Sequence, residues 1–383
     1  MEGKNISRRL YQIIKGEIRS KGPITFAKFM EICLYHPELG YYSSGRARRG
    51  RDGDYFTSPT VHPIFGASLG KQVAQMWRIL GEGDFEVVEM GGGEGYLCHD
   101  LLNYLRGHEP RFYDRLHYRM VETGPSVIES QKELLGPLQD KVSWHRPGEM
   151  GEGRIVGCFL SNELLDSFPV HRTVMRAGVL REICVDAQDG GLRELLGGSS
   201  VPELEGYFQR LGISLAEGQK AEVCLEALRW LREVAQWLER GFVITIDYGF
   251  PAQELFSPHR RDGTLLCYRD HMVSSDPYVQ LGQQDMTTHV DFTSLIECGE
   301  QWGLRFTGLV PQYKFLLGLG LLDEVAVGEG AKEEREAMVQ RLTIKNLILP
   351  GGMGDTFKVL IQHKGIERPQ LHGLREPFDG GEQ

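Results

Sequence analysis

A glycine-rich turn, Glu89-Met90-Gly91-Gly92-Gly93-Glu94-Gly95, stands at the centre of the clearest pattern in this 383-residue sequence. An apolar run, Phe85–Met90, leads into it with the length of a buried strand, and Tyr96–Arg106 follows with leucines at helical spacing. Glycines in a strand-to-helix turn let the backbone approach a nucleotide closely. The stretch therefore predicts a nucleotide-binding turn, although a tight turn without a ligand has the same local pattern.

Strands and helices alternate outward from this turn. A helix is predicted at 126–135, and further strands are predicted at His117–Glu122, Val142–His145, Ile155–Ser161 and Phe242–Asp247. This alternation is typical of a parallel sheet covered by helices on both faces. We therefore predict an α/β, Rossmann-like fold in which the ligand binds at the carboxyl ends of the strands.

Other segments surround this core. Residues 170–195 predict a hairpin with extra strands, residues 249–290 are irregular, and helices are predicted at 5–20, 26–35, 219–239 and 331–345. For the domains, we predict N-terminal helices and a lid loop over 1–60, a cofactor-binding core over 61–169 and 241–363, an insertion over 170–240 and a flexible tail over 364–383.

Composition excludes several classes of protein. The formal net charge of −10 argues against sequence-independent binding of nucleic acid, which needs a basic surface. No apolar run has the length of a membrane span. The seven cysteines are scattered without a Cys-x-x-Cys pair, so neither a disulfide framework nor a metal site is predicted. Because Glu2 and Glu17 interrupt the basic N-terminal residues, we expect no transit peptide and a cytoplasmic protein.

The residues around the turn favour one nucleotide. A dinucleotide fingerprint requires a small residue where Tyr96 stands, and the lysine of a phosphate-binding loop is absent. The carboxylate of Glu89 suits the cationic methionyl group of S-adenosylmethionine better than a pyrophosphate. Glu122, at the end of the next strand, is placed to accept hydrogen bonds from ribose hydroxyls, or is a solvated strand-end acid. We therefore expect an S-adenosylmethionine-dependent methyltransferase.

A second polar motif ends the strand at 155–161. It reads Ser161-Asn162-Glu163-Leu164-Leu165-Asp166 and should share an edge of the sheet with the glycine turn. Two carboxylates there can clamp a guanidinium group and stabilise its positive charge, so Glu163 and Asp166 are candidate catalytic residues. Capping of a following helix by Asn162 or Ser161 is the alternative interpretation.

The order of several such blocks resembles the MidA-like family of class I methyltransferases. The family includes an arginine methyltransferase that acts in the assembly of mitochondrial respiratory complex I. The blocks span about residues 5 to 362, and they are His36-Pro37-Glu38-x-Gly40-Tyr41-Tyr42, Gly53-Asp54-Tyr55-Phe56-Thr57-Ser58-Pro59, Phe65-Gly66, Glu89 to Gly95, Asn162-Glu163-x-x-Asp166-x-x-Pro169-Val170, Ile246-Asp247-Tyr248-Gly249, Gly263-Thr264-Leu265, Asp285 to Phe292 and Gly354 to Leu360.

The resemblance implies a seven-stranded, mostly parallel sheet with N-terminal helices and a β-rich insertion. It implies a cofactor lined by Thr57, Ser58, Pro59, Glu89, Gly91, Gly93, Gly95, Glu122 and Asn162, with Asn162 and Glu163 next to the methyl group. Substrate contacts are expected at Asp247, His289 and Asp291, although His289 also suits an ordinary polar contact and Asp291 a helix cap.

The expected reaction is methylation of an arginine side chain on a partner protein, by resemblance a subunit of the complex I type. Two alternatives are a non-catalytic assembly factor that binds S-adenosylmethionine and an NAD-dependent dehydrogenase. The intact glycines and acids of the turn argue against the first, and Tyr96 argues against the second.

Overall fold

A computed structural model describes residues 2–43, 62–151, 154–188, 191–324, 338 and 356–375. The chain divides into two compact units. Unit 1 comprises residues 1–55, 165–231 and 249–297, and unit 2 comprises residues 56–164, 232–248 and 298–383. The expected cofactor residues Thr57, Ser58 and Pro59, the lid loop and the helix at 331–345 lie outside the described residues.

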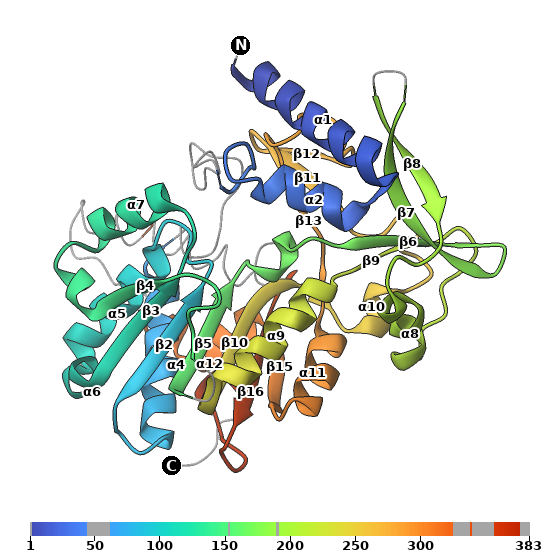
Figure 1. Cartoon of the computed structure of the whole chain (residues 1–383). Helices are drawn as coiled ribbons and strands as arrows, with labels where there is room; N and C mark the ends of the chain where they lie inside the picture. The colour runs from blue at the N-terminus through green and yellow to red at the C-terminus, as the bar shows by residue number, and fades with distance from the viewer. Residues whose placement is uncertain are drawn as a thin grey trace. The chain divides into compact units, whose positions relative to one another are not determined.

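Unit 2 holds a mixed sheet in the order β15-β16-β10-β5-β2-β3-β4. Its strands are β15 (Arg305–Pro311), β16 (Phe357–Lys364), β10 (Leu238–Phe250), β5 (Ile155–Asn162), β2 (Phe85–Met90), β3 (Leu116–Val121) and β4 (Val142–His145). The five strands from β10 to β4 run parallel, and β16 runs antiparallel to both of its neighbours. The α/β, Rossmann-like prediction is confirmed (Figure 1).

The seven-stranded prediction needs one correction. The last two residues of β10, Gly249 and Phe250, continue past the unit 2 sheet and pair in parallel with β14 (Val290–Asp291). The connected sheet therefore counts eight strands. A two-residue strand carries no periodic pattern, so only its pairing identifies it.

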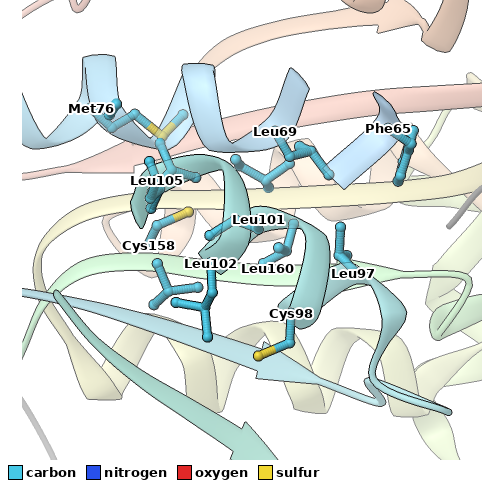
Figure 2. Packing of buried hydrophobic residues seen from close by; sticks show 14 of the residues in the cluster. Phe65, Leu69, Met76, Leu97, Cys98, Leu101, Leu102, Leu105, Cys158 and Leu160 are labelled. Carbon is cyan, nitrogen blue, oxygen red and sulfur yellow. The ribbon is translucent and has the colours of Figure 1, made fainter. Parts of the chain in front are cut away.

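Helices of unit 2 lie before, between and after its strands along the chain. They are α4 (Ile64–Ile79), α5 (Tyr96–His108), α6 (Pro110–Arg115), α7 (Pro125–Leu135) and α12 (Gln312–Gly318). Figure 2 shows side chains of α4, α5 and β5 gathered in one apolar cluster. Helices α4 and α5 approach closely because α4 carries Gly66 and Gly70: a Cβ on Gly66 would lie 2.6 Å from the Cβ of Asp100. The core thus fixes the helix that begins at the glycine turn.

Unit 1 is richer in antiparallel strands. Its larger sheet joins β1 (Ile24–Thr25), β7 (Val179–Gln188), β6 (His171–Arg176) and β9 (Lys220–Val223), with β8 (Gly191–Gly197) on β7. A three-stranded sheet holds β12 (Met272–Ser274), β11 (Leu266–Arg269) and β13 (Asp285–Thr287). Its helices are α1 (Glu2–Lys21), α2 (Phe26–Tyr35), α8 (Pro202–Arg210) and α10 (Ala252–Leu255). Two further helices, α9 (Leu225–Trp237) and α11 (Phe292–Gln301), begin in unit 1 and end in unit 2.

Local turn chemistry explains the predicted hairpin, and tertiary pairing changes two other predictions. Ala177 and Gly178 both adopt positive φ, 51° and 71°, which is the geometry of a tight turn between β6 and β7. The helix predicted at 219–239 begins only at Leu225, because β9 pairs with β6 instead. The stretch 249–290, predicted as irregular, contains α10 and the three-stranded sheet.

In the part of the chain that the structure describes, no helix is long and apolar enough to cross a bilayer. No group of three or more potential metal-ligating side chains occurs among the same residues.

Candidate cofactor site

The glycine turn of unit 2 adopts a backbone that only glycine accepts easily. Gly91, Gly93 and Gly95 have φ values of 72°, 53° and 91°, all in the left-handed region. Gly95 is the N-cap residue of α5, and a Cβ on Gly91 would lie 2.7 Å from a methyl carbon of Leu164. The positive φ values therefore favour glycine at all three positions, and the close approach of Leu164 leaves no room for a side chain at Gly91.

A buried glutamine from α7 holds the turn. The Gln131 side chain is completely buried, and its Nε2 donates to the carbonyl oxygen of Gly93 at 2.7 Å. Its Oε1 accepts from Nε1 of Trp144 on β4 at 2.8 Å. A Cβ on Gly95 would lie 3.2 Å from Cγ of Gln131, so the side chain also supports that glycine. The sequence analysis did not identify Gln131 or Trp144, because neither belongs to a motif with chemistry of its own.

Glu89 lies under the turn. Its side chain is 2% exposed, and its Oε2 accepts a hydrogen bond from the Tyr118 hydroxyl at 2.8 Å. A Cβ on Gly92 would lie 3.1 Å from the carboxyl carbon of Glu89, so the turn folds directly over this carboxyl group. The carboxylate thus contributes negative charge beneath the turn.

Glu122 follows β3 at the same edge of the sheet. Its Oε1 accepts the backbone amides of Thr123 at 2.7 Å and Gly124 at 2.9 Å. The backbone amide of Glu122 donates to the carbonyl of His145, at the end of β4. These bonds fix a partly exposed carboxylate at the carboxyl end of β3.

The end of β5 carries the second polar motif. Asn162 Nδ2 donates to Glu163 Oε1 at 3.1 Å, and the Glu163 amide donates to the carbonyl of Ile246 on β10 at 2.9 Å. Glu163 has a φ of 52°, a left-handed conformation that is unfavourable for a residue with a side chain. Non-glycine residues held in this region often occur at functional sites.

Asp247 holds this turn from below. Its side chain is fully buried, its Oδ2 accepts the amide of Leu164 at 3.2 Å, and its Oδ1 accepts the amide of Tyr248 at 2.9 Å. The residue was expected to contact substrate. Its two carboxylate oxygens accept one backbone amide from the turn after β5 and one from the next residue of β10, and its contact with substrate stays a prediction.

The remaining site residues lie in unit 1. The carbonyl of Asp166 accepts the amide of Thr288 at 2.9 Å. Burial, helped by the charge of Arg260, lowers the pKa of His289 to about 4, so this ring is neutral at physiological pH. Burial raises the pKa of Asp291, whose Oδ2 accepts from the hydroxyls of Tyr207 at 2.8 Å and Ser294 at 2.7 Å.

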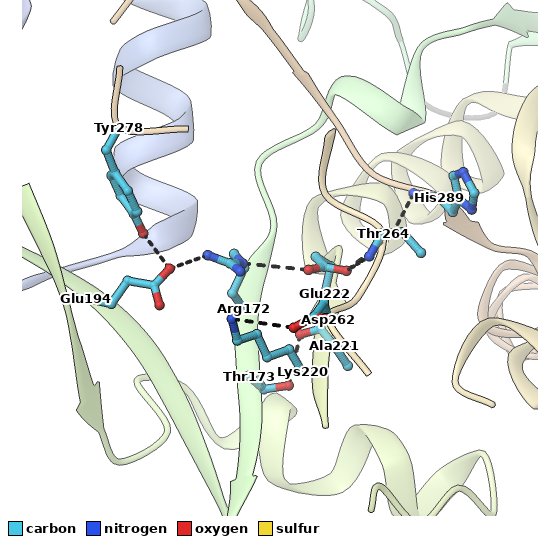
Figure 3. A network of polar contacts seen from close by, with 10 residues as sticks. All are labelled: Arg172, Thr173, Glu194, Lys220, Ala221, Glu222, Asp262, Thr264, Tyr278 and His289. Atoms are coloured by element: carbon cyan, nitrogen blue, oxygen red, sulfur yellow. Dashed lines mark hydrogen bonds and ion pairs between the residues drawn. The ribbon is translucent and has the colours of Figure 1, made fainter. Parts of the chain in front are cut away.

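A buried charge network in the same unit escaped sequence analysis. Figure 3 shows the guanidinium of Arg172 between Glu194, 2.6 Å away, and Glu222, 3.7 Å away. Glu222 Oε2 accepts the amide of Thr264 at 2.7 Å, and Thr264 Oγ1 accepts the amide of His289 at 3.1 Å. The network therefore fixes the backbone of the segment that contains the expected substrate residues.

The unit 2 residues fit S-adenosylmethionine. The left-handed glycines leave the backbone open to a ligand, and Glu89 and Glu122 supply negative charge around the turn. Asn162 Oδ1 is buried and has no hydrogen-bond partner among the residues that the structure describes. A buried acceptor of this kind needs a donor, such as the ammonium group of the cofactor.

Comparison with known proteins gives a consistent result. The sequence model of a family described as "Putative S-adenosyl-L-methionine-dependent methyltransferase" matches residues 68–310. A crystal structure from Burkholderia thailandensis, bound to S-adenosyl-homocysteine, is 31% identical with a TM-score of 0.90 and covers all of this chain and 97% of that one. The mitochondrial protein arginine methyltransferase NDUFAF7 homologue of Drosophila melanogaster is 28% identical over 92% of this chain and 84% of its own, and the human NDUFAF7 protein is 27% identical over 92% and 83%.

The expectation of a cytoplasmic protein is wrong by this comparison, because the fly and human relatives are named as mitochondrial. That expectation depended on the acidic residues near the N-terminus. In the structure Glu17 pairs with Lys21, 2.6 Å away, within α1. This segment therefore forms a helix of the fold, and its composition does not indicate a cellular location.

Proposed function

Since the chain belongs to the MidA-like S-adenosyl-L-methionine-dependent methyltransferases, we propose that it methylates an arginine side chain of a partner protein. The names of the fly and human relatives, both protein arginine methyltransferases, support this acceptor. When bound, S-adenosylmethionine supplies a methyl group activated by its sulfonium. The acidic balance of the chain, −10 at pH 7, suits a cationic acceptor and disfavours nucleic acid.

The observation that carries the proposal is the turn at the end of β5. Glu163 is held there in a left-handed conformation by the carbonyl of Ile246, and Asp247 accepts the next amide along the chain. Because these bonds already hold the turn in place, no further free energy is needed to position the Glu163 carboxylate when a substrate binds. We assign to Glu163 the part of holding the guanidinium group through charge-assisted hydrogen bonds. Asp247 then acts as a positioning residue for Glu163.

The other assignments follow from the same proposal. Glu89, Gly91, Gly93, Gly95, Glu122 and Asn162 would hold the cofactor, together with Thr57, Ser58 and Pro59 by resemblance. We propose Asn162 and Asp166 as further catalytic residues. His289 and Asp291 would contribute to substrate recognition, His289 as a neutral ring because of its lowered pKa.

Mass spectrometry tests whether an arginine of a partner protein accepts the methyl group. Proteins that co-purify with this chain are compared between cells that contain it and cells that lack it, and we expect at least one methylated arginine to disappear in its absence. If the partner proteins are recovered without any change in arginine methylation, the chain is a binding factor and the enzymatic proposal fails.

Glu163→Gln tests the catalytic assignment. The substitution keeps the size of the side chain but removes the charge that stabilises a guanidinium. We expect methylation of the identified partner to fall about 100-fold, while calorimetry shows S-adenosylmethionine binding within about twofold of the wild type. Glu129→Gln, at an exposed position on α7, is the matched control and should leave both unchanged. Unchanged methylation by Glu163→Gln would remove Glu163 from the mechanism.

A further inference from the structure

A tyrosine that belongs to no recognisable motif lies next to the cofactor turn. Tyr118 of β3 is completely buried, and its hydroxyl donates to Glu89 Oε2 at 2.8 Å. In the parallel pairing of β2 and β3, Tyr118 stands opposite Val87, two residues before Glu89. Both side chains therefore lie on the same face of the sheet, and the phenol reaches along the strand to the carboxylate.

The hydroxyl is not needed for packing. The Tyr118 ring belongs to the apolar cluster of unit 2, where a phenylalanine ring would fill nearly the same volume. The added oxygen is a polar group in that core, and burying it without a partner costs free energy. Glu89 provides the partner. Burial and the nearby Glu89 charge raise the pKa of Tyr118 well above its usual value, so the phenol keeps its proton and remains a donor.

The bond determines where the charge of Glu89 lies. A carboxylate accepts hydrogen bonds through either oxygen, and its side chain can rotate unless a donor holds it. Here the donor comes from below, while the turn covers the carboxyl group from above: a Cβ on Gly92 would lie 3.1 Å from its carbon. The negative charge is thus held directly beneath the backbone of the turn.

We propose that Tyr118 is a positioning residue for cofactor recognition, because its hydroxyl fixes the Glu89 carboxylate beneath the glycine turn. The fixed charge then favours ligands that carry the α-ammonium group found at the amino-acid end of S-adenosylmethionine. This inference rests on the proposed assignment of Glu89 to the cofactor site. It adds to that assignment a residue that neither touches the ligand nor belongs to the glycine motif.

Tyr118→Phe tests the inference with three ligands. S-adenosylmethionine and S-adenosylhomocysteine both carry the ammonium group, whereas 5′-methylthioadenosine has the adenosine without the amino-acid end. We expect calorimetric Kd values for the first two to rise about 10-fold, as for the loss of one hydrogen bond to a charged group. The Kd for 5′-methylthioadenosine should stay within about twofold. A purely structural role would weaken all three ligands equally.

Two control variants distinguish a failure of the Tyr118 inference from a failure of the Glu89 assignment. Tyr113→Phe removes a hydroxyl from another tyrosine packed on the same cluster and should change none of the three Kd values. Glu89→Gln should reproduce the selective loss for the two amino-acid ligands. If Glu89→Gln shows that loss and Tyr118→Phe does not, the Tyr118 inference is overturned and the cofactor site stands. If Glu89→Gln itself has no effect, the assignment of Glu89 fails and the inference fails with it. Thermal unfolding without ligand verifies that each variant is folded.

Discussion

The glycine turn of unit 2 and the Arg172 network of unit 1 are both buried polar arrangements, but the chain builds them in opposite ways. The turn comes from one short segment, and neutral donors from Gln131 and Tyr118 support it. The network joins the guanidinium of Arg172 to carboxylates at positions 194 and 222 and to the backbone amide of Thr264, all on separate segments. The turn is therefore specified by local sequence, whereas the network exists only once unit 1 has folded.

This difference predicts that substitutions in the glycine turn and in the Arg172 network will have different effects. Removing Gln131 leaves neutral groups of the turn and of Trp144 without their partners, which costs about 1–3 kcal/mol. Removing the cation of the network leaves the buried carboxylate of Glu222 without compensation, which costs more. Mutations in unit 1 should therefore act mainly on stability, and mutations around the turn mainly on cofactor binding.

The largest effect is expected from Arg172→Met. The methionine fills part of the space over the Phe26 ring, where the guanidinium now lies 5.0 Å from the ring centre, but it cannot compensate Glu222. We expect the free energy of unfolding to fall by about 3–5 kcal/mol in urea titrations. Arg181→Met, at an exposed position of β7, is the control. Equal losses from both variants would show that the network contributes no more than a surface charge.

Gln131→Met should have an intermediate effect. It leaves the Gly93 carbonyl and the Trp144 ring nitrogen without their bonds to residue 131, at a cost of about 2 kcal/mol. Because the backbone of the whole turn loses support, we expect Kd to rise about 10-fold for S-adenosylmethionine and 5′-methylthioadenosine alike, in contrast to Tyr118→Phe. Gln139→Met, exposed after α7, should change neither ligand. A loss restricted to the amino-acid ligands would contradict separate roles for Gln131 and Tyr118.

The smallest effect is a dependence of stability on pH. Burial raises the pKa of Glu222 above its ordinary value of 4.5, although Arg172 and Thr264 oppose the shift. Above pH 4.5 the unfolded chain loses this proton first, so the folded state binds more protons and the free energy of unfolding falls as pH rises towards the folded pKa. One such group changes stability by at most about 1.4 kcal/mol per pH unit. Because the lowered pKa of His289 acts in the opposite direction, the quantity to compare is the difference between the two proteins: in urea titrations between pH 4 and 8, the wild type should lose stability relative to Glu222→Gln as pH rises. Identical slopes would contradict the raised pKa.

Comparison of sequence and structure shows what a local pattern can predict. Strands β2 and β4 were predicted with their observed ends, from short segments that contain β-branched and aromatic residues. The helix predicted at 219–239 was partly wrong, because pairing with β6 turned Lys220–Val223 into a strand. The eighth strand, β14, is too short to have a period and is defined only by its neighbour.

The cofactor site shows the same contrast between features that a local pattern predicts and features that depend on tertiary contacts. The glycine turn, the acids at the strand ends and hence the class of cofactor can be predicted from local sequence, because backbone conformation and strand order depend on residues close together in the chain. The support of the Glu163 turn by Asp247, of Glu89 by Tyr118 and of Gly93 by Gln131 depends on how distant segments pack in the folded chain. Those contacts join residues from 29 to 83 positions apart, and neither the length of a strand nor the period of a helix encodes which of them will meet.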